Sequence, residues 1–275
     1  MRTLVVISLV AMSFGLHAQT DPPAALVAKA AAYVEGYEAK FSAVVCEERQ
    51  TQTVINANGS IQKHRALVSD LLLVKTGRGT HVFRDVIRVD GKPVRDRQER
   101  LRKLFLGESR NPVRQAGAIS KESSRYNIGF PRGIEALLMP LEILHAEHAS
   151  GFHFQAAAAG LAFDEFRQPA MVGYADGKTR HDMFLHGTLD VDAGGTITGA
   201  SLSAEHPLFL LTVTMKYAED GASGLLVPTE SHEHYQTPKS KDRLDVDSTY
   251  ANFRRFQVTT SETVAKPVGQ APADR

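Results

Sequence analysis

Apolar and polar residues alternate through much of the second half of this chain. Such alternation is typical of antiparallel strands that bury one face and expose the other to solvent. Two runs carry the pattern most clearly. The apolar positions are Met183, Leu185, Leu189 and Val191 in the first run, and Phe209, Leu211, Val213, Met215 and Tyr217 in the second. The pattern therefore constrains this part of the chain to an antiparallel sheet with one apolar face.

The first half of the chain contains a hairpin signal. Two β-prone runs, residues 42–56 and 61–75, are separated by Asn58-Gly59. An Asn-Gly pair between such runs predicts a tight turn, because both turn positions favour positive φ. Further strands are predicted over residues 81–89, 225–235 and 249–259, so the domain should contain about 9–11 antiparallel strands.

The other regular elements are predicted helices. Asp21-Pro22-Pro23 is a typical helix start, because Asp caps the helix and proline suits its first turn. An apolar stripe follows at Leu26, Ala30, Tyr33, Tyr37 and Phe41. Short helices are predicted within residues 96–105 and 134–145, and Pro140 should break or restart the second. Residues 107–132 are expected to form a loop with one short helix.

These elements predict one α+β domain over residues 19–260. Residues 261–275 contain three alanines and two prolines without an apolar period. We therefore predict a disordered tail over these residues.

Residues 1–18 have the pattern of a secretory signal peptide. Arg2 precedes an apolar run over residues 4–16, and Ala18 is a small residue near the expected cleavage point. The run is too short to span a bilayer, which needs about 20 apolar residues. We expect cleavage near Ala18 and a soluble periplasmic or extracellular protein. The alternative is a buried N-terminal helix.

Charge and cysteine content exclude some classes of function. Lys and Arg number 32, Asp and Glu number 31, and the net charge is +1. This balance supplies no overall field that would attract nucleic acid, so no nucleic-acid partner is expected. The single cysteine excludes an intramolecular disulfide framework and a Cys-rich zinc site. The oligomeric state does not follow from these numbers.

Few residues point to catalysis or metal binding. His145 and His148, and His232 and His234, could each supply two metal ligands. Neither pair forms an H-E-x-x-H motif, so solvated histidines are the simpler interpretation. Cys46 is followed by Glu47 and Glu48, whose charges oppose formation of a reactive thiolate. The sequence contains no G-x-S-x-G elbow and no phosphate-binding loop. We therefore expect no enzyme activity, no metal and no cofactor.

Residues 95–103 form a charged run with five positive and two negative side chains. Arginine forks in such a run could bind a phosphate or a lipid headgroup. The alternative is a solvated helix face with i, i+4 pairs between Asp96 and Arg100 and between Glu99 and Lys103.

Several segments resemble bacterial outer-membrane lipoprotein-sorting (LolA-like) proteins. Residues 187–192 (GTLDVD) and 195–197 (GTI) are similar to one hairpin of that family, and 213–217 (VTMKY) with 224–228 (GLLVP) to the next. Residues 250–256 (YANFRRF) resemble the closing strand. The resemblance covers about residues 181–260 and the opening helix and hairpin. The whole chain also resembles an uncharacterised set of secreted bacterial proteins with no assigned activity.

The resemblance implies a strongly curved antiparallel sheet, an open half-barrel covered by helices, that holds an apolar ligand on its concave face. The insertion at about residues 95–150 and the absence of tryptophan depart from the family pattern. The expected function is non-enzymatic binding of a lipid or lipidated protein. The alternative is a periplasmic protein-interaction module with a filled core. The expected ligand-binding residues are Met183, Leu185, Leu189, Val191, Phe209, Leu211, Val213 and Met215 on the sheet, with Leu138, Leu141 and Leu144 as the cap.

Overall fold

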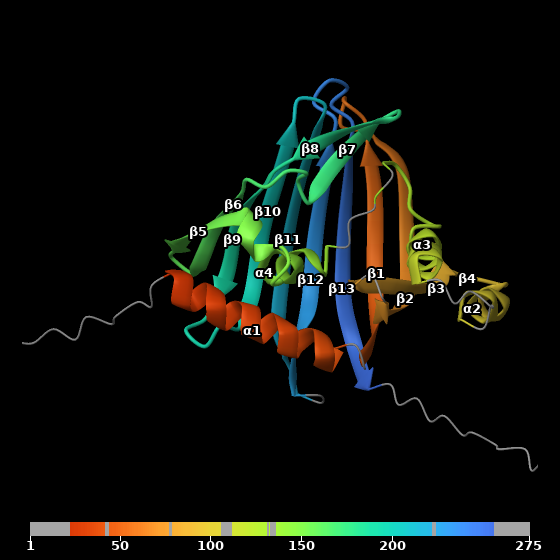
Figure 1. The fold of residues 1–275 in the computed structure, drawn as a ribbon. Coiled ribbons are helices and arrows are strands. Elements are labelled where there is room, and N and C mark those ends of the chain that lie inside the picture. The colour runs from red at the N-terminus through yellow and green to blue at the C-terminus, as the bar shows by residue number, and fades with distance from the viewer. Residues whose placement is uncertain are drawn as a thin grey trace, which may run out of the picture.

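The computed structural model describes residues 23–41, 44–76, 79–105, 112–130, 132, 136–221 and 224–255 (Figure 1). The signal-peptide and tail predictions, at residues 1–18 and 261–275, lie outside these ranges. None of the described helices is both long enough and apolar enough to cross a membrane.

An eleven-stranded antiparallel sheet dominates the structure, in the order β4-β3-β2-β1-β13-β12-β11-β10-β9-β6-β5. The edge strands β4 and β5 do not pair with each other, so the sheet is open. A separate two-stranded hairpin is formed by β7 and β8. The strands are β1 (Val44–Ile55), β2 (Ile61–Thr76), β3 (Gly79–Val89), β4 (Lys92–Pro93), β5 (Phe152–Ala157), β6 (Gly160–Glu165), β7 (Val172–Asp176), β8 (Thr179–Met183), β9 (Leu185–Val191), β10 (Ile197–His206), β11 (Phe209–Asp220), β12 (Leu225–Gln236) and β13 (Arg243–Arg255).

The predicted hairpin at Asn58-Gly59 is confirmed. Strands β1 and β2 pair in antiparallel register on either side of it. Gly59 has a φ of 84°, and its N–H donates to the carbonyl oxygen of Asn56 at 2.8 Å. Glycine adopts this left-handed conformation without the steric cost that a Cβ atom would add. The local turn chemistry therefore sets the register of the two long strands.

One face of the sheet, here called the covered face, carries most of the other elements (Figure 1). Helix α1 (Pro23–Phe41) crosses the strands near one end, and α4 (Met139–Leu144) lies above the middle of the sheet. The β7–β8 hairpin lies beyond α4, and α3 (Pro112–Ser123) packs over β3. Helix α2 (Arg97–Phe105) lies beside α3, and a 3₁₀ turn (Ala149–Gly151) precedes β5.

The structure refines several sequence-based boundaries. The helix predicted within residues 134–145 begins only at Met139, because Pro140 occupies its first turn, where a missing N–H costs nothing. The twelve-residue helix α3 lies within residues 107–132, where the sequence predicts a loop with one short helix. The described residues form thirteen strands, eleven of them in the large sheet, against the 9–11 predicted for the domain, because the short β5–β6 and β7–β8 hairpins lack long alternating runs.

Candidate functional site

All the apolar residues predicted to bind a ligand meet in one buried cluster. Their exposed fractions range from 0% for Leu189, Val213 and Leu144 to 8% for Phe209. Strands β9 and β11 supply most of them, and Leu138, Leu141 and Leu144 approach from the region of α4. Met183 joins the same cluster from the end of β8, which belongs to the separate hairpin. The alternation therefore identified residues that do share one side of the molecule.

Helix α4 is short and almost wholly apolar, which explains its position against the sheet. Five of its six residues are buried, and only Glu142 is polar. The loop before it is anchored by Tyr217 of β11, whose hydroxyl donates to the carbonyl oxygen of Leu137 at 3.5 Å. The buried apolar area of this helix stabilises its contact with the sheet.

Helix α1 covers the neighbouring part of the sheet with an aromatic stripe. The Tyr37 ring stacks on Phe41 with centroids 5.2 Å apart and meets Tyr217 edge-on at 6.5 Å. Cys46 of β1 is fully buried in the same cluster. Burial, together with Glu48, raises the pKa of the Cys46 thiol to about 12. The thiol is therefore protonated and unreactive at neutral pH unless this region opens.

We define the cover as α1, α4 and the β7–β8 hairpin. Side-chain packing, rather than backbone–backbone hydrogen bonding, holds the cover on the sheet. Among the described residues, no backbone–backbone hydrogen bond joins α1 or α4 to a sheet strand, and β7 and β8 pair only with each other. Elements held by side-chain packing can separate locally while the hydrogen-bonded sheet stays intact.

The contact between α1 and α4 contains ionisable groups. Oε2 of Glu142 lies 3.0 Å from Nδ1 of His148. Burial raises the pKa of Glu142 and Glu38 of α1 adds to this, while His148 and His145 lower it. Because the net pKa shift is upward, proton uptake by Glu142 favours the folded state as the pH falls through this pKa.

The turn between β9 and β10 contacts α1 at Lys29. Gly195 has a φ of 94°, and a Cβ atom added there would lie 2.6 Å from the carbonyl carbon of Lys29. Nζ of Lys29 donates to the carbonyl oxygen of Ala193 at 3.1 Å. Oδ1 of Asp192 accepts the N–H groups of Gly194 at 2.8 Å and Thr196 at 2.9 Å. These bonds, that from Thr196 first, lower the pKa of Asp192.

Replacing Asp192 with alanine should destabilise the protein at neutral pH by about 0.5–1 kcal/mol, because two turn N–H groups lose their acceptor. The pKa of Asp192 is lowered by folding, so its contribution is present above its unfolded pKa and is lost as the pH falls through the folded value. Urea denaturation at pH 7 and near pH 3 checks this, with Asp176→Ala at the end of β7 as control. A difference between Asp192→Ala and wild type that is unchanged by acid would contradict the assignment.

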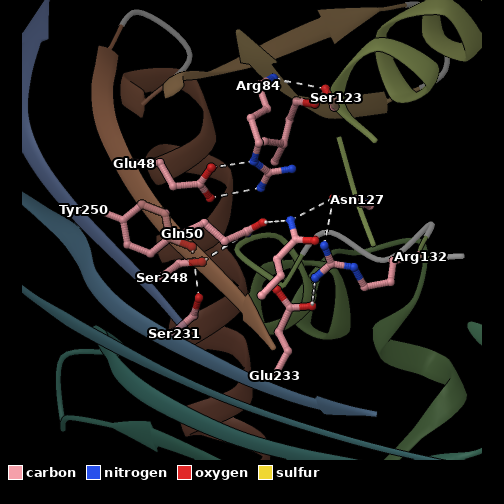
Figure 2. A network of polar contacts seen from close by, with 12 residues as sticks. Glu48, Gln50, Arg84, Ser123, Asn127, Arg132, Ser231, Glu233, Ser248 and Tyr250 are labelled. Carbon is pink, nitrogen blue, oxygen red and sulfur yellow. Dashed lines mark hydrogen bonds and ion pairs between the residues drawn. The ribbon is translucent and has the colours of Figure 1, made fainter. Parts of the chain in front are cut away.

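The other half of the covered face is polar, and none of its residues was among the predicted binding residues (Figure 2). Glu48 is fully buried, and both its oxygens accept hydrogen bonds from Arg84 of β3, with Oε1 and Nη2 3.0 Å apart. The backbone N–H of Arg84 donates to Oγ of Ser123 at 3.0 Å, and that hydroxyl donates to the carbonyl oxygen of Val82 at 3.2 Å. The C-terminal end of α3 is thereby attached to β3.

A second part of this network joins the segment after α3 to β1 and β12 (Figure 2). Gln52 accepts the N–H of Ile128 at 2.9 Å, and its own amide donates to Gln50 at 2.7 Å. Arg132 donates to Oδ1 of Asn127 at 2.7 Å and lies 3.7 Å from Oε2 of Glu233. The hydroxyl of Tyr235 also donates to Glu233.

Each buried carboxylate in this network is matched by an arginine, so the arrangement serves to position the segment over the sheet. Glu47 and Glu48 face opposite sides of β1, as adjacent strand residues must. The sequence signal for the polar half was the alternation of Glu48, Gln50 and Gln52, which is as regular as that of the apolar half. The partners Arg84, Arg132 and Glu233 are distant in sequence, and only the fold brings them together.

Three of the four candidate histidines contact a carboxylate. Nδ1 of His148 lies 3.0 Å from Oε2 of Glu142, and the rings of His145 and His148 have centroids 6.0 Å apart. Nδ1 of His232 lies 2.6 Å from Asp247, and Nδ1 of His234 lies 2.6 Å from Asp245. In the part of the chain that the structure describes, no group of three or more His, Cys, Asp or Glu side chains is arranged to hold a metal ion.

The fold and the covered apolar cluster define the class of this protein: an open antiparallel-sheet protein with helices on one face. No protein-family model matches the chain, and no curated protein matches it. Among solved structures, a DUF1329 family protein from Desulfovibrio piger is similar, with 9% sequence identity and a TM-score of 0.30. The similarity covers 88% of this chain and 96% of that one. A similarity at this level assigns neither a family nor a function.

Proposed function

We propose that this protein is an exported, non-enzymatic binding protein that takes an apolar chain, such as an acyl chain of a lipid or lipidated protein, between the sheet and its cover. The observation that carries the proposal is the arrangement of the covered face. The cover lies over the apolar cluster, and in the described part of the chain no backbone–backbone hydrogen bond joins the cover to the sheet. N-terminal sequencing of the cellular protein tests export, with a first residue of Gln19 expected and Met1 contradicting it.

The energetics favour a ligand with a long apolar chain. Binding requires the cover to move, which exposes buried apolar side chains of α1 and α4. Burying hydrocarbon returns about 0.8 kcal/mol per CH₂ group, so a 16-carbon chain supplies on the order of 10 kcal/mol before ordering costs. A short apolar ligand would contribute too little free energy of burial to offset the free energy needed to open the cover.

A second candidate function is a protein-interaction module in which the covered face is ordinary core. The low exposure of Leu185, Leu211 and Val213, at 0–1%, favours this candidate. Interior packing at normal density leaves no space for a ligand unless the cover moves. The two candidates therefore differ in whether the cover separates from the sheet under native conditions.

Cys46 tests this separation, because it is the single cysteine of the chain and is buried in the cluster. We expect a thiol reagent to label Cys46 of the native protein through local opening, at a rate that depends weakly on urea. A chain with Cys46→Ser serves as the labelling control. If labelling shows the same opening free energy and urea dependence as global unfolding, the cover does not separate and the interaction module is the better assignment.

A further inference from the structure

A groove of about 600 Å³ is lined by residues of α2, α3 and the turn after α3, and none of these residues belongs to the apolar cluster. Four of its lining residues are cationic, whereas Glu122 is its one carboxylate among the described residues. The lining consists of Arg100, Lys103, Ala118, Lys121, Glu122, Ser124 and Arg125. Arg100 and Lys103 belong to the charged run of residues 95–103, and α3 and the turn after it supply the others. The groove therefore joins two cationic segments that are separate in the sequence.

Two arginines in the groove are held in place by one aromatic ring. The guanidinium carbons of Arg100 and Arg125 lie 5.7 Å and 5.6 Å from the centroid of the Tyr126 ring. Such cation–π contacts orient the guanidinium groups without neutralising their charge. The side chain of Arg100 is only 10% exposed, and its Nη2 makes no hydrogen bond in the structure. This nitrogen is itself buried, so the solvent-facing cations of the groove are Lys103, Lys121 and Arg125.

Nearby carboxylates neutralise part of this charge. Asp96 lies 3.3 Å from Nε of Arg100 and 3.6 Å from Nη1 of Arg125. Glu122 pairs with both arginines, and Lys103 pairs with Glu99 at 2.7 Å. Lys121 is exposed, and no ion pair forms between it and the described carboxylates. Counting Asp96 and Glu99 as well, cations still outnumber carboxylates around the groove.

We propose that this groove binds a phosphate group. Arginine forks match the oxygens of phosphate, and a lysine at the rim adds a mobile point charge. The phosphate would accept hydrogen bonds from Lys121 and Arg125, two of the exposed cations of the groove. It could belong to a soluble phosphate ester or to the headgroup of an anionic phospholipid, and the chemistry of recognition is the same in both. The site is separate from the apolar cluster and does not depend on the proposed binding of an apolar chain.

Two binding measurements at constant ionic strength distinguish the sources. Calorimetric titration with glycerol 3-phosphate detects a soluble ester, and co-sedimentation with phosphatidylglycerol vesicles, compared with phosphatidylcholine vesicles, detects a headgroup. Lys121→Glu and, separately, Arg125→Ala are the test variants, since both side chains are exposed and should be replaceable without unfolding. Lys178→Glu, an exposed lysine in the β7–β8 turn, makes the same charge change outside the groove.

We expect binding in at least one measurement, weakened about tenfold by Lys121→Glu and less by Lys178→Glu. Binding of glycerol 3-phosphate would identify a soluble ester as sufficient, and binding to phosphatidylglycerol vesicles alone would identify a membrane headgroup. Absence of binding in both measurements would overturn the proposal. Equal losses in Lys121→Glu and Lys178→Glu, with no loss in Arg125→Ala, would also overturn it.

Discussion

Replacing Arg84 with methionine is expected to destabilise the protein by about 3–5 kcal/mol, because Glu48 would be left as a buried charge without its partner. Glu48 has no exposed surface, and Arg84 supplies two hydrogen bonds to its carboxylate. Urea denaturation at pH 7 measures the loss. The hydrogen bond to Ser123 comes from the backbone N–H of residue 84 and is kept in the variant, so the loss measures the charge pair itself.

A matched control exists on β1, on the face opposite to Glu48. Arg49 pairs with Glu47 at 2.6 Å, but its side chain is 67% exposed. Arg49→Met should therefore cost less than about 1 kcal/mol. The double variant Glu48→Gln with Arg84→Met should lose less than the sum of the two single variants, since no charge remains unpaired. An Arg84→Met protein as stable as Arg49→Met would show that the Glu48 site is not buried.

Leu211→Ala is the second substitution with a large expected effect, a loss of about 2–5 kcal/mol. Leu211 is 1% exposed and lies in the apolar cluster beneath the cover. Removing its side chain subtracts transfer energy and leaves a cavity that the surrounding residues fill only in part. Chemical denaturation with an unchanged m-value would confirm that stability alone has changed.

Leu210→Ala provides the control for this substitution, because Leu210 neighbours Leu211 on β11 and is only half-buried. We expect its loss to be clearly smaller, in proportion to its partial burial. If Leu211→Ala costs no more than Leu210→Ala, the leucine already borders an empty space in the resting protein. The packed description of the covered face would then be wrong.

Local sequence rules predicted the long strands well, because each of these strands carries its own signal. The Asn58-Gly59 turn and the alternation of Phe209, Leu211 and Val213 depend on neighbouring residues, and both are confirmed in the sheet. The two hairpins implied by the family resemblance, within residues 187–197 and 213–228, also form. Period-two patterns reflect which residues share a face, and that information is local.

Contacts between distant segments were not predictable in this way. Glu48 and Arg84 lie on β1 and β3, and Arg132 reaches Glu233 across a long sequence separation. Neither pair has a spacing rule that would reveal it. Met183 lies in the predicted apolar cluster, but the alternation that runs through residue 184 did not reveal that β8 and β9 belong to different sheets. The strong curvature implied by the family resemblance remains a prediction.

The groove between α2 and α3 illustrates how much the fold adds to a charge pattern. Charge runs of this kind usually form a solvated helix face, and the i, i+4 pairs Asp96–Arg100 and Glu99–Lys103 expected for such a face do form. The sequence could not place Lys121 and Arg125 opposite that helix, because α3 lies within a segment that carries no clear apolar period.

Native mass spectrometry tests the central claim, that the covered face binds an apolar chain, most directly. The chain should be purified from its own compartment without detergent, and then supplied with palmitate after organic extraction. We predict a bound mass of an acyl-containing lipid in the first sample and a one-to-one palmitate complex in the second, reduced in the Leu211→Ala variant relative to Leu210→Ala. Recovery of the ligand-free mass in both samples would contradict the claim and leave the interaction module as the better account.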